Sequence, residues 1–424
     1  MKIWLINSQE QIPYLNSKRR PMRMGLIAKS AIARGHSVTW WTSAFEHVSK
    51  RYVAREEKSE QICENLNVYW LSAIGYSNHV SIRRLINNLF VAYRFYIRSK
   101  DVAKPDLIVV SFPIPELAFA AVRYGKQYNI PVVVDVRDWW PDALFYSFPK
   151  WLKPLLGIAT IPYEVLIGKT FKSATAITGI TREFVLWGLS KAKRKITELD
   201  KDFPHGYEKE EMSRQDIREA DSYWEKLGVK KEMKLYNIVF LGSITRSSNF
   251  APIIDASLRL SNDDNHIRFI FCGSGDRLKQ LKKMAKGINN IVVNGQWVDR
   301  YKIASLLNRA AIGLVPLPDR PDFLNTINNK TIEYLSYSLP IIVSPKRSLV
   351  AKIAEENNFG VSWDGYDGEQ LIRCIKKVIN SNTDYNKMSQ AAATYFAVNY
   401  RAENVYGKYL EHIEKIEKDY RERK

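Results

Sequence analysis

The strongest constraint on the fold is an alternation of short apolar, β-rich runs with helical patterns, which occurs twice along the chain. In the first half, the expected strands are residues 2–7, 37–42, 68–71, 106–111, 131–136 and 176–179. In the second half, they are residues 237–241, 267–271, 290–293, 312–316, 339–343 and 360–363. Apolar strands separated by helices indicate a parallel sheet covered on both faces. We therefore predict an α/β fold with two doubly wound, Rossmann-like domains.

A charged stretch from about residue 196 to 236 separates the two alternations. We expect a first domain over residues 1–200, a linker over 201–235 and a second domain over 236–395. A C-terminal helix over residues 396–424 is expected to return toward the first domain. At 424 residues, the chain is long enough for two separate cores.

The charge balance points to an anionic partner. Lys and Arg number 64 against 45 Asp and Glu, a formal net charge of +19. Nucleic acid, an anionic membrane and phosphorylated substrates all fit such an excess. The basic residues are dispersed and match no nucleic-acid recognition motif, so we expect no nucleic acid. No run of about 18 apolar residues occurs, which predicts a cytoplasmic chain.

Two segments interrupt the alternation. In residues 82–97, apolar residues share one helical face and arginines lie on another. The apolar set is Ile82, Leu85, Ile86, Leu89, Phe90, Tyr93 and Ile97, and the basic set is Arg83, Arg84, Arg94 and Arg98. The second segment, residues 151–171, is apolar with two prolines. A basic amphipathic helix fits a membrane surface, and packing on its own domain fits equally.

Three features of the second half fit a phosphate site. Gly242 follows an expected strand and precedes a helix, with Arg246 close behind, so backbone N–H groups there can approach a phosphate. Gly273 lies in a second turn, G-S-G, which by itself fits a simple tight turn. Lys330 and Glu333 are three residues apart at a helix start, where they either address one ligand or form an exposed pair.

These features occur in the order found in a known family. I-N-N-K-T-I-E-Y-L-S-Y-S-L-P-I-I (327–342) resembles the "P-N-K-x-x-E-Y-L-A-A-G-x-P-V-I" segment of family 4 glycosyltransferases. F-L-G-S (240–243), the 271–276 turn and N-G-Q-W-V-D-R-Y (294–301) precede it in order. In the first half, V-D-V-R-D-W-W-P-D (134–142) and F-P-H-G-Y (203–207) resemble bacterial O-antigen and capsule transferases of the L-fucosamine transferase type.

The resemblance implies a GT-B fold, in which two Rossmann-like domains face each other across a cleft, the first binding acceptor and the second the nucleotide-sugar donor. It implies that Lys330 holds the donor diphosphate and Glu333 the ribose. The further donor-binding residues it implies are Gly242, Ser243, Arg246, Gly273, Trp297, Val298, Asn325 and Thr326. The acceptor-binding residues it implies are Arg19, Arg20, Asp138 and Trp139, with Arg137 near the reacting sugar.

The sequence departs from the family at three places. Asn325 occupies the position of the first glutamate in the family's E-x7-E pattern. Ser248 and Asn249 stand where lysine and glycine are common after the glycine turn, and 336–338 is Ser-Tyr-Ser rather than Ala-Ala-Gly. These departures leave open a non-catalytic scaffold that binds nucleotide sugar, and a nucleotide-sugar epimerase on the same fold is a further alternative.

The resemblance implies retaining transfer from a nucleotide sugar, expected to be a UDP-sugar, by a hexosyl- or N-acetylhexosaminyltransferase. Lys330 and Arg246 would stabilise the leaving diphosphate, while Arg137 either contacts a phosphate or pairs with Asp138 or Asp142. We expect no cofactor and no metal, because the D-x-D match at 200–202 lies in a charged stretch where chance matches are common. The expected acceptor is a polyprenyl-diphosphate-linked saccharide at the anionic inner face of the cytoplasmic membrane.

Overall fold

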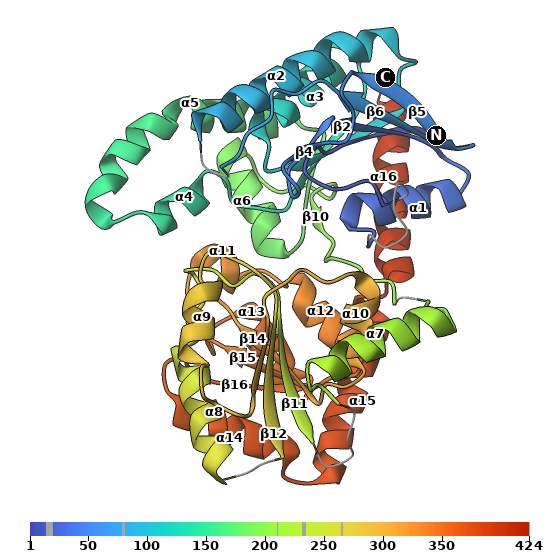
Figure 1. Cartoon of the computed structure of the whole chain (residues 1–424). Coiled ribbons are helices and arrows are strands. Elements are labelled where there is room, and N and C mark those ends of the chain that lie inside the picture. The colour runs from blue at the N-terminus through green and yellow to red at the C-terminus, as the bar shows by residue number, and fades with distance from the viewer. Residues whose placement is uncertain (14–19, 79–80, 210, 231–234, 264–265, 424) are drawn as a thin grey trace. The chain divides into compact units, whose positions relative to one another are not determined.

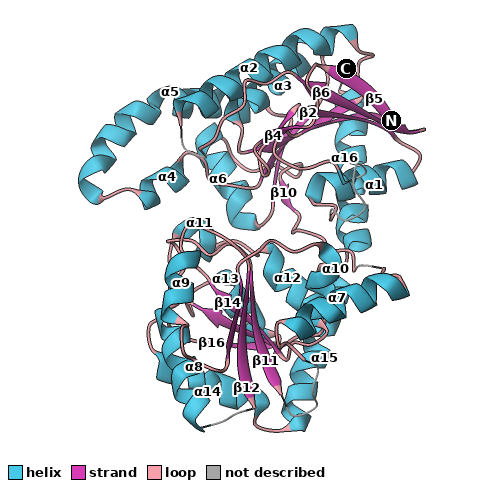
Figure 2. Cartoon of the chain, in the orientation of Figure 1, coloured by secondary structure: helices cyan, strands magenta, loops and turns pink. Residues whose placement is uncertain are grey.

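The chain folds into two units, each built on one mainly parallel sheet (Figures 1 and 2). The computed structural model describes residues 1–13, 20–78, 81–209, 211–230, 235–263 and 266–423. The first unit comprises Met1–Pro204 and Ala402–Lys424, and the second His205–Arg401.

The sheet of the first unit has the strand order β10-β9-β8-β7-β1-β2-β6-β5. β5 runs antiparallel to β6, and the other neighbouring pairs are parallel. The strands are β1 (Lys2–Ile6), β2 (Ser37–Ser43), β5 (Lys58–Cys63), β6 (Leu66–Leu71), β7 (Leu107–Phe112), β8 (Val132–Val136), β9 (Ala176–Gly179) and β10 (Lys201–Asp202). A separate ribbon pairs β3 (Phe45–Glu46) with β4 (Arg51–Tyr52). Sequence did not predict β5, because this edge strand is polar and largely exposed.

Helices cover both faces of this sheet. One core cluster contains side chains of α2 (Ile82–Arg98), α3 (Pro115–Tyr128), α5 (Lys153–Ser173) and α6 (Arg182–Ala192). The opposite cluster contains side chains of α1 (Arg23–Ala33) and α16 (Ala402–Glu422). The short α4 (Asp142–Ser147) and two 3-10 turns, η2 (Ser99–Asp101) and η3 (Lys150–Leu152), lie in connections.

The sheet of the second unit is wholly parallel, in the order β13-β12-β11-β14-β15-β16. The strands are β11 (Tyr236–Leu241), β12 (Ile267–Cys272), β13 (Ile291–Asn294), β14 (Ile312–Pro316), β15 (Ile341–Ser344) and β16 (Gly360–Ser362). Helices α8 (Ala251–Asp263), α9 (Leu278–Met284) and α14 (Gly368–Ile379) contribute to one core cluster. The other cluster contains residues of α7 (Arg214–Lys226), α10 (Arg300–Leu307), α12 (Asn329–Ser336), α13 (Leu349–Glu356) and α15 (Asn382–Asn399). The single-turn helix α11 (Pro321–Leu324) precedes α12.

Two domain boundaries in the structure differ from those expected from the sequence. The stretch expected as a linker contains α7, whose buried Trp224 donates a hydrogen bond of 2.7 Å from Nε1 to the Lys302 carbonyl, so this stretch belongs largely to the second unit. Residue 396, the expected start of the C-terminal helix, lies inside α15. The chain returns to the first unit only at Ala402, where α16 begins and buries Tyr406, Tyr409 and Ile413 against that unit's sheet.

Each sheet has one point at which successive connections turn in opposite directions. In the first unit this point lies between β1 and β7, and in the second between β11 and β14. In doubly wound sheets, ligands bind beyond the carboxyl ends of the strands at such a switch point. A ligand site is therefore expected at these two places.

Candidate functional site

Beyond β11 and β12, two glycine turns of the second unit pack directly on each other. The Gly242 N–H donates to the Cys272 carbonyl, and the Ile244 N–H to the Ser274 carbonyl, each over 3.0 Å. Gly273 has a φ of +153°, and a Cβ there would lie 1.8 Å from the Gly242 carbonyl oxygen. Only glycine allows this approach. The G-S-G turn thus packs against the Gly242 turn and holds its backbone in place.

Lys330 places its ammonium group beside the Gly242 turn. The side chain leaves the first turn of α12, a helix capped by Asn328, whose Oδ1 accepts the Thr331 N–H at 2.9 Å. Lys330 Nζ lies 4.2 Å from the Phe240 ring centroid and would be 3.2 Å from a Cβ at residue 242. Within the described residues it has no hydrogen-bond or ion-pair partner. Burial lowers the pKa of this ammonium group to about 8.

Tyr334, one helical turn after Lys330, fixes α12 to the sheet at the switch point. Its hydroxyl accepts the Leu241 N–H at 2.8 Å, immediately before Gly242. Its ring occupies the space beside Gly313 on β14, where an added Cβ would lie 2.3 Å from the ring. Sequence reasoning missed Tyr334, although a glycine inside an apolar strand is a known signal of close approach.

The other predicted donor residues lie on α12, at the end of α11 and in the segments that follow β11 and β13. Glu333 is buried on α12, and Asn325, at the end of α11, donates from Nδ2 to the Pro321 carbonyl over 2.9 Å. Thr326 follows and is partly exposed, whereas Ser243, after Gly242, is exposed. Trp297 is 70% exposed after β13, and Val298 packs against the core. Their contacts with a donor stay predictions.

Arg246 lines a pocket at the start of α8. Its guanidinium pairs with Asp276 at 3.1 Å, and its side chain is 78% exposed. A cavity of about 360 Å³ is lined by residues 246–251, at the start of α8, and by Arg277, Gln280, Leu281 and Met284. An exposed ion pair of this kind is weak, so Arg246 can exchange Asp276 for another anion at little cost.

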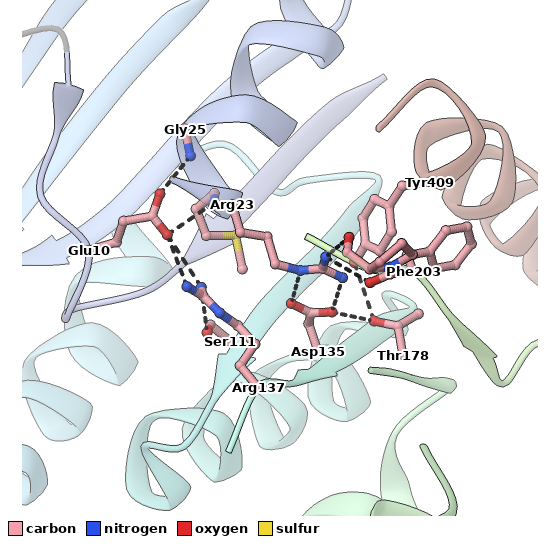
Figure 3. Close-up of polar contacts among 11 residues, drawn as sticks. Glu10, Arg23, Gly25, Ser111, Asp135, Arg137, Thr178, Phe203 and Tyr409 are labelled. Carbon is pink, nitrogen blue, oxygen red and sulfur yellow. Dashed lines mark hydrogen bonds and ion pairs between the residues drawn. The ribbon is translucent and has the colours of Figure 1, made fainter. Parts of the chain in front are cut away.

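At the switch point of the first unit, Arg137 has a different partner from those expected (Figure 3). Both terminal nitrogens lie 3.3 Å from Glu10 Oε2, and Nη1 donates to Ser111 Oγ at 3.1 Å. The pairing with Asp142 is wrong, because Asp142 accepts hydrogen bonds from Trp187 Nε1 and Lys191 Nζ. Sequence reasoning also missed Glu10.

Glu10 is the centre of this arrangement. Besides Arg137, its carboxylate accepts the Met24 N–H at 3.1 Å and the Gly25 N–H at 2.9 Å, at the start of α1. The side chain is buried. Glu10 therefore holds Arg137 at the carboxyl end of β8 and neutralises it.

A second buried pair lies next to this one. Arg23 donates from Nε and Nη2 to the two oxygens of Asp135, each at 2.8 Å, and both side chains are fully buried. Arg23 Nη1 also donates to the Phe203 and Pro204 carbonyls, and Thr178 Oγ1 donates to Asp135 (Figure 3). Burial alone would raise the pKa of Asp135, but Arg23 holds it below its usual value. The pair ties α1, β8 and β9 to the chain segment that leaves the unit.

The predicted acceptor residues fall into different environments. Asp138 is exposed and Arg20 partly exposed, whereas Arg19 lies outside the described residues. Trp139 is buried, with ring centroids 5.3 Å from Phe184 and 6.4 Å from Trp187, which favours a packing role. The D-x-D match is structural at its first position: Asp200 accepts from Arg194 and from the Ile177 N–H. Elsewhere in the described ranges, no three His, Cys, Asp or Glu residues gather in a cluster fit for a metal.

Comparison with known proteins defines the class. Residues 236–381 match the family described as glycosyl transferases group 1. No curated protein sequence matches the chain. Among solved structures, sucrose-phosphate synthase from Thermosynechococcus elongatus aligns over 98% of both chains, with a TM-score of 0.71 and 11% identity.

Two further structures align over almost the whole chain. HepE from Anabaena in complex with UDP and glucose aligns over 98% of this chain and 100% of its own, at a TM-score of 0.65 and 13% identity. WaaG, a glycosyltransferase involved in lipopolysaccharide biosynthesis, aligns over 96% and 98%, at a TM-score of 0.63 and 14% identity. The chain thus has the GT-B fold, and its second unit carries a group 1 glycosyltransferase domain.

Proposed function

We propose that this protein is a retaining glycosyltransferase that moves a sugar from a nucleotide-sugar donor to a lipid-linked saccharide. The observation that carries the proposal is Lys330, a cation with no counter-ion within the described chain, beside the bare backbone of Gly242 at the switch point. A diphosphate supplies the missing negative charge, and the absence of a side chain at Gly242 lets its oxygens approach the backbone of the strand-to-helix turn.

The proposed chemistry requires charge stabilisation rather than a protein base. As the glycosidic bond breaks, negative charge grows on the leaving diphosphate, and a preorganised cation stabilises it most when it is already desolvated. Lys330 meets that condition, and Arg246 adds a second cation if it leaves Asp276. The donor is proposed to be a UDP-sugar; HepE was solved with UDP and glucose. Activity without a divalent metal remains a prediction, tested by turnover in EDTA.

The acceptor is proposed to be a polyprenyl-diphosphate-linked saccharide used for bacterial surface polysaccharide, either O-antigen or capsule. Similarity of fold to WaaG supports a place in such a process. The switch point of the first unit carries Arg137, held by Glu10, and the exposed Asp138. These groups are our candidates for contact with the acceptor.

A thermal-shift screen across nucleotide sugars tests donor binding. A ligand at a hundred times its dissociation constant adds about 2.7 kcal/mol to the free energy of unfolding. The thermal shift caused by the best donor should be smaller in Lys330→Ala and in Glu333→Ala than in the natural chain. If both variants show the same shift as the natural chain, the proposed site is refuted. Mass spectrometry of the best donor, with and without acceptor, then separates transfer from epimerisation.

A scaffold that binds nucleotide sugar without transferring it is favoured by one observation, Asn325. Its side chain donates to the helix α11 backbone, where the family's glutamate would offer a carboxylate. Donor binding without transfer to any lipid-linked saccharide would support this alternative over the proposed enzyme.

A further inference from the structure

Two helices of the first unit expose large apolar side chains in continuous stripes. On α2, Ile82, Ile86, Leu89 and Tyr93 are spaced four, three and four residues apart, so they lie on one helical face. Along η3 and α5, the stripe is formed by Trp151, Leu155, Ile158, Ile161 and Val165. Each of these nine side chains is at least 49% exposed, and Ile82 and Trp151 exceed 70%.

These stripes are not the faces that hold the helices to their unit. α2 packs inward through Asn87, Val91, Ala92 and Phe95. α5 packs inward through Thr160, Ile167, Thr170 and Phe171. The alternative that the apolar face of residues 82–97 packs on its own domain is therefore wrong for its four most exposed members. Such an apolar surface requires a partner.

Both stripes belong to one helical layer, and that layer is basic. α2, α3 and α5 share one core cluster on the same face of the sheet, with α3 in contact with both neighbours (Figure 1). The exposed charged side chains on these three helices are Arg83, Arg98, Arg123, Lys126, Lys169 and Lys172. All are cations. The partly buried Glu164 of α5 is paired with Lys191.

We infer that this layer, the α2–α5 surface, docks on a lipid membrane with anionic headgroups. Apolar side chains of an interfacial helix enter the acyl boundary while flanking Lys and Arg side chains reach the headgroups. A second copy of the chain is a poorer occupant, because a symmetric contact would bring the same cations against each other. No helix of the described chain is long and apolar enough to cross a bilayer, so the contact is peripheral.

The inference extends the proposed function, because a lipid-linked acceptor lies in a membrane, but its test needs neither donor nor acceptor. The full chain is floated with phosphatidylcholine vesicles that contain or lack phosphatidylglycerol. At low salt, we expect flotation with the anionic vesicles and a sharp decrease at high salt. Failure of flotation contradicts docking alone, and failure of transfer with intact flotation contradicts the proposed function alone.

Two variants separate the apolar and charged contributions. Leu155→Ser/Ile158→Ser should reduce the partition coefficient at least about tenfold, since both side chains leave water on docking. Lys169→Gln/Lys172→Gln should reduce it about 25-fold, or about fivefold for each lost charge. The control, Ile217→Ser/Leu258→Ser, removes two exposed apolar side chains, 43% and 47% exposed, from α7 and α8 of the second unit and should float like the natural chain.

Thermal unfolding checks that each variant is folded. The inference would be overturned if Leu155→Ser/Ile158→Ser floated as well as the natural chain. It would also be overturned if the natural chain stayed in the soluble fraction at low salt. Sedimentation velocity tests whether a second copy of the chain binds this surface instead. If Leu155→Ser/Ile158→Ser converts a dimer to a monomer and leaves flotation unchanged, the surface is a self-association contact.

Discussion

The switch points of the two sheets share a topology but differ in how their charged groups are satisfied. In the first unit, Arg23 is neutralised by Asp135 and Arg137 by Glu10, with further hydrogen bonds from both pairs to the backbone or to hydroxyl groups. In the second unit, Lys330 has no counter-ion within the described residues and faces a glycine turn.

This difference separates structural charges from charges held ready for a ligand. A buried ion pair with complete hydrogen bonding fixes the elements that carry it, and removing one partner leaves a buried charge. An unpaired, partly buried cation weakens the fold slightly and is retained where a ligand supplies the anion. We therefore expect the first network to control stability and Lys330 to control donor binding and rate.

The largest expected effect is on stability, in Arg23→Met. This change leaves Asp135 buried without its cation and should reduce the free energy of unfolding by about 3–5 kcal/mol, measured by urea denaturation. Adding Asp135→Asn should recover part of the loss, because the uncompensated charge is then gone.

Lys415→Met is the matched control for this prediction, since the ion pair of Lys415 with Glu198 in the same unit is about half exposed on each side. It should leave the free energy of unfolding almost unchanged, because exposed ion pairs contribute little to stability. Equal effects of Arg23→Met and Lys415→Met would remove the distinction between the two kinds of charge.

The next largest effect is on catalysis, in Lys330→Met. Loss of the cation should reduce kcat by about 10²–10³-fold, the usual result of removing one group that stabilises developing charge. The free energy of unfolding should not fall, because a desolvated ammonium group is removed. Lys346→Met is the control: Lys346, after β15, is exposed and pairs with Asp364. A stability loss in Lys330→Met like that of Arg23→Met would contradict the comparison.

A smaller effect is expected from Tyr334→Phe. The variant keeps the ring beside Gly313 but leaves the buried Leu241 N–H without its acceptor, at a cost of about 1–3 kcal/mol in unfolding free energy. Nucleotide affinity should fall a few-fold, since Leu241 precedes the Gly242 turn. The control Tyr366→Phe, at an exposed side chain, should change neither the unfolding free energy nor the nucleotide affinity. If Tyr334→Phe lowers stability but leaves nucleotide affinity unchanged, the Gly242 turn does not depend on Tyr334.

Much of the fold was predictable because buried parallel strands are continuous apolar runs, which sequence displays directly. The apolar run of β7, for example, is buried along its whole length. The polar edge strand β5 was missed, since exposed strands lack that pattern. Helix α7 was read as linker because its few buried residues, such as Trp224, are separated by charged ones.

The candidate site was predictable only where a local motif carried it. Lys330 and the glycine turns are motif residues, and the structure brings Lys330 and Gly242 together. Glu10 and Arg23 were not predictable, because their partners Arg137 and Asp135 lie more than a hundred residues away in sequence. Spacing arguments reach along one helix or strand, whereas these pairs depend on which strands are neighbours in the sheet.

The last effect concerns pH, is absent near neutral pH, and follows from the sign of the Lys330 pKa shift. Its pKa of about 8 lies below the ordinary 10.5, so Lys330 is charged below pH about 8 but loses its proton more easily in the folded than in the unfolded chain. The unliganded protein therefore gains stability as pH rises from about 8 to 10.5. A bound diphosphate favours the ammonium form and raises this pKa. Binding above pH about 8 must therefore take up a proton, and UDP affinity should decrease by up to about tenfold per pH unit there, while it stays level just below.

Calorimetry of UDP binding at rising pH, in buffers of different ionisation enthalpy, measures the proton uptake directly. Lys330→Arg should bind without it, because a guanidinium does not lose its proton in this range. A proton uptake that persists in Lys330→Arg would come from a group other than Lys330. The unpaired cation would then not be the feature that distinguishes the two switch points.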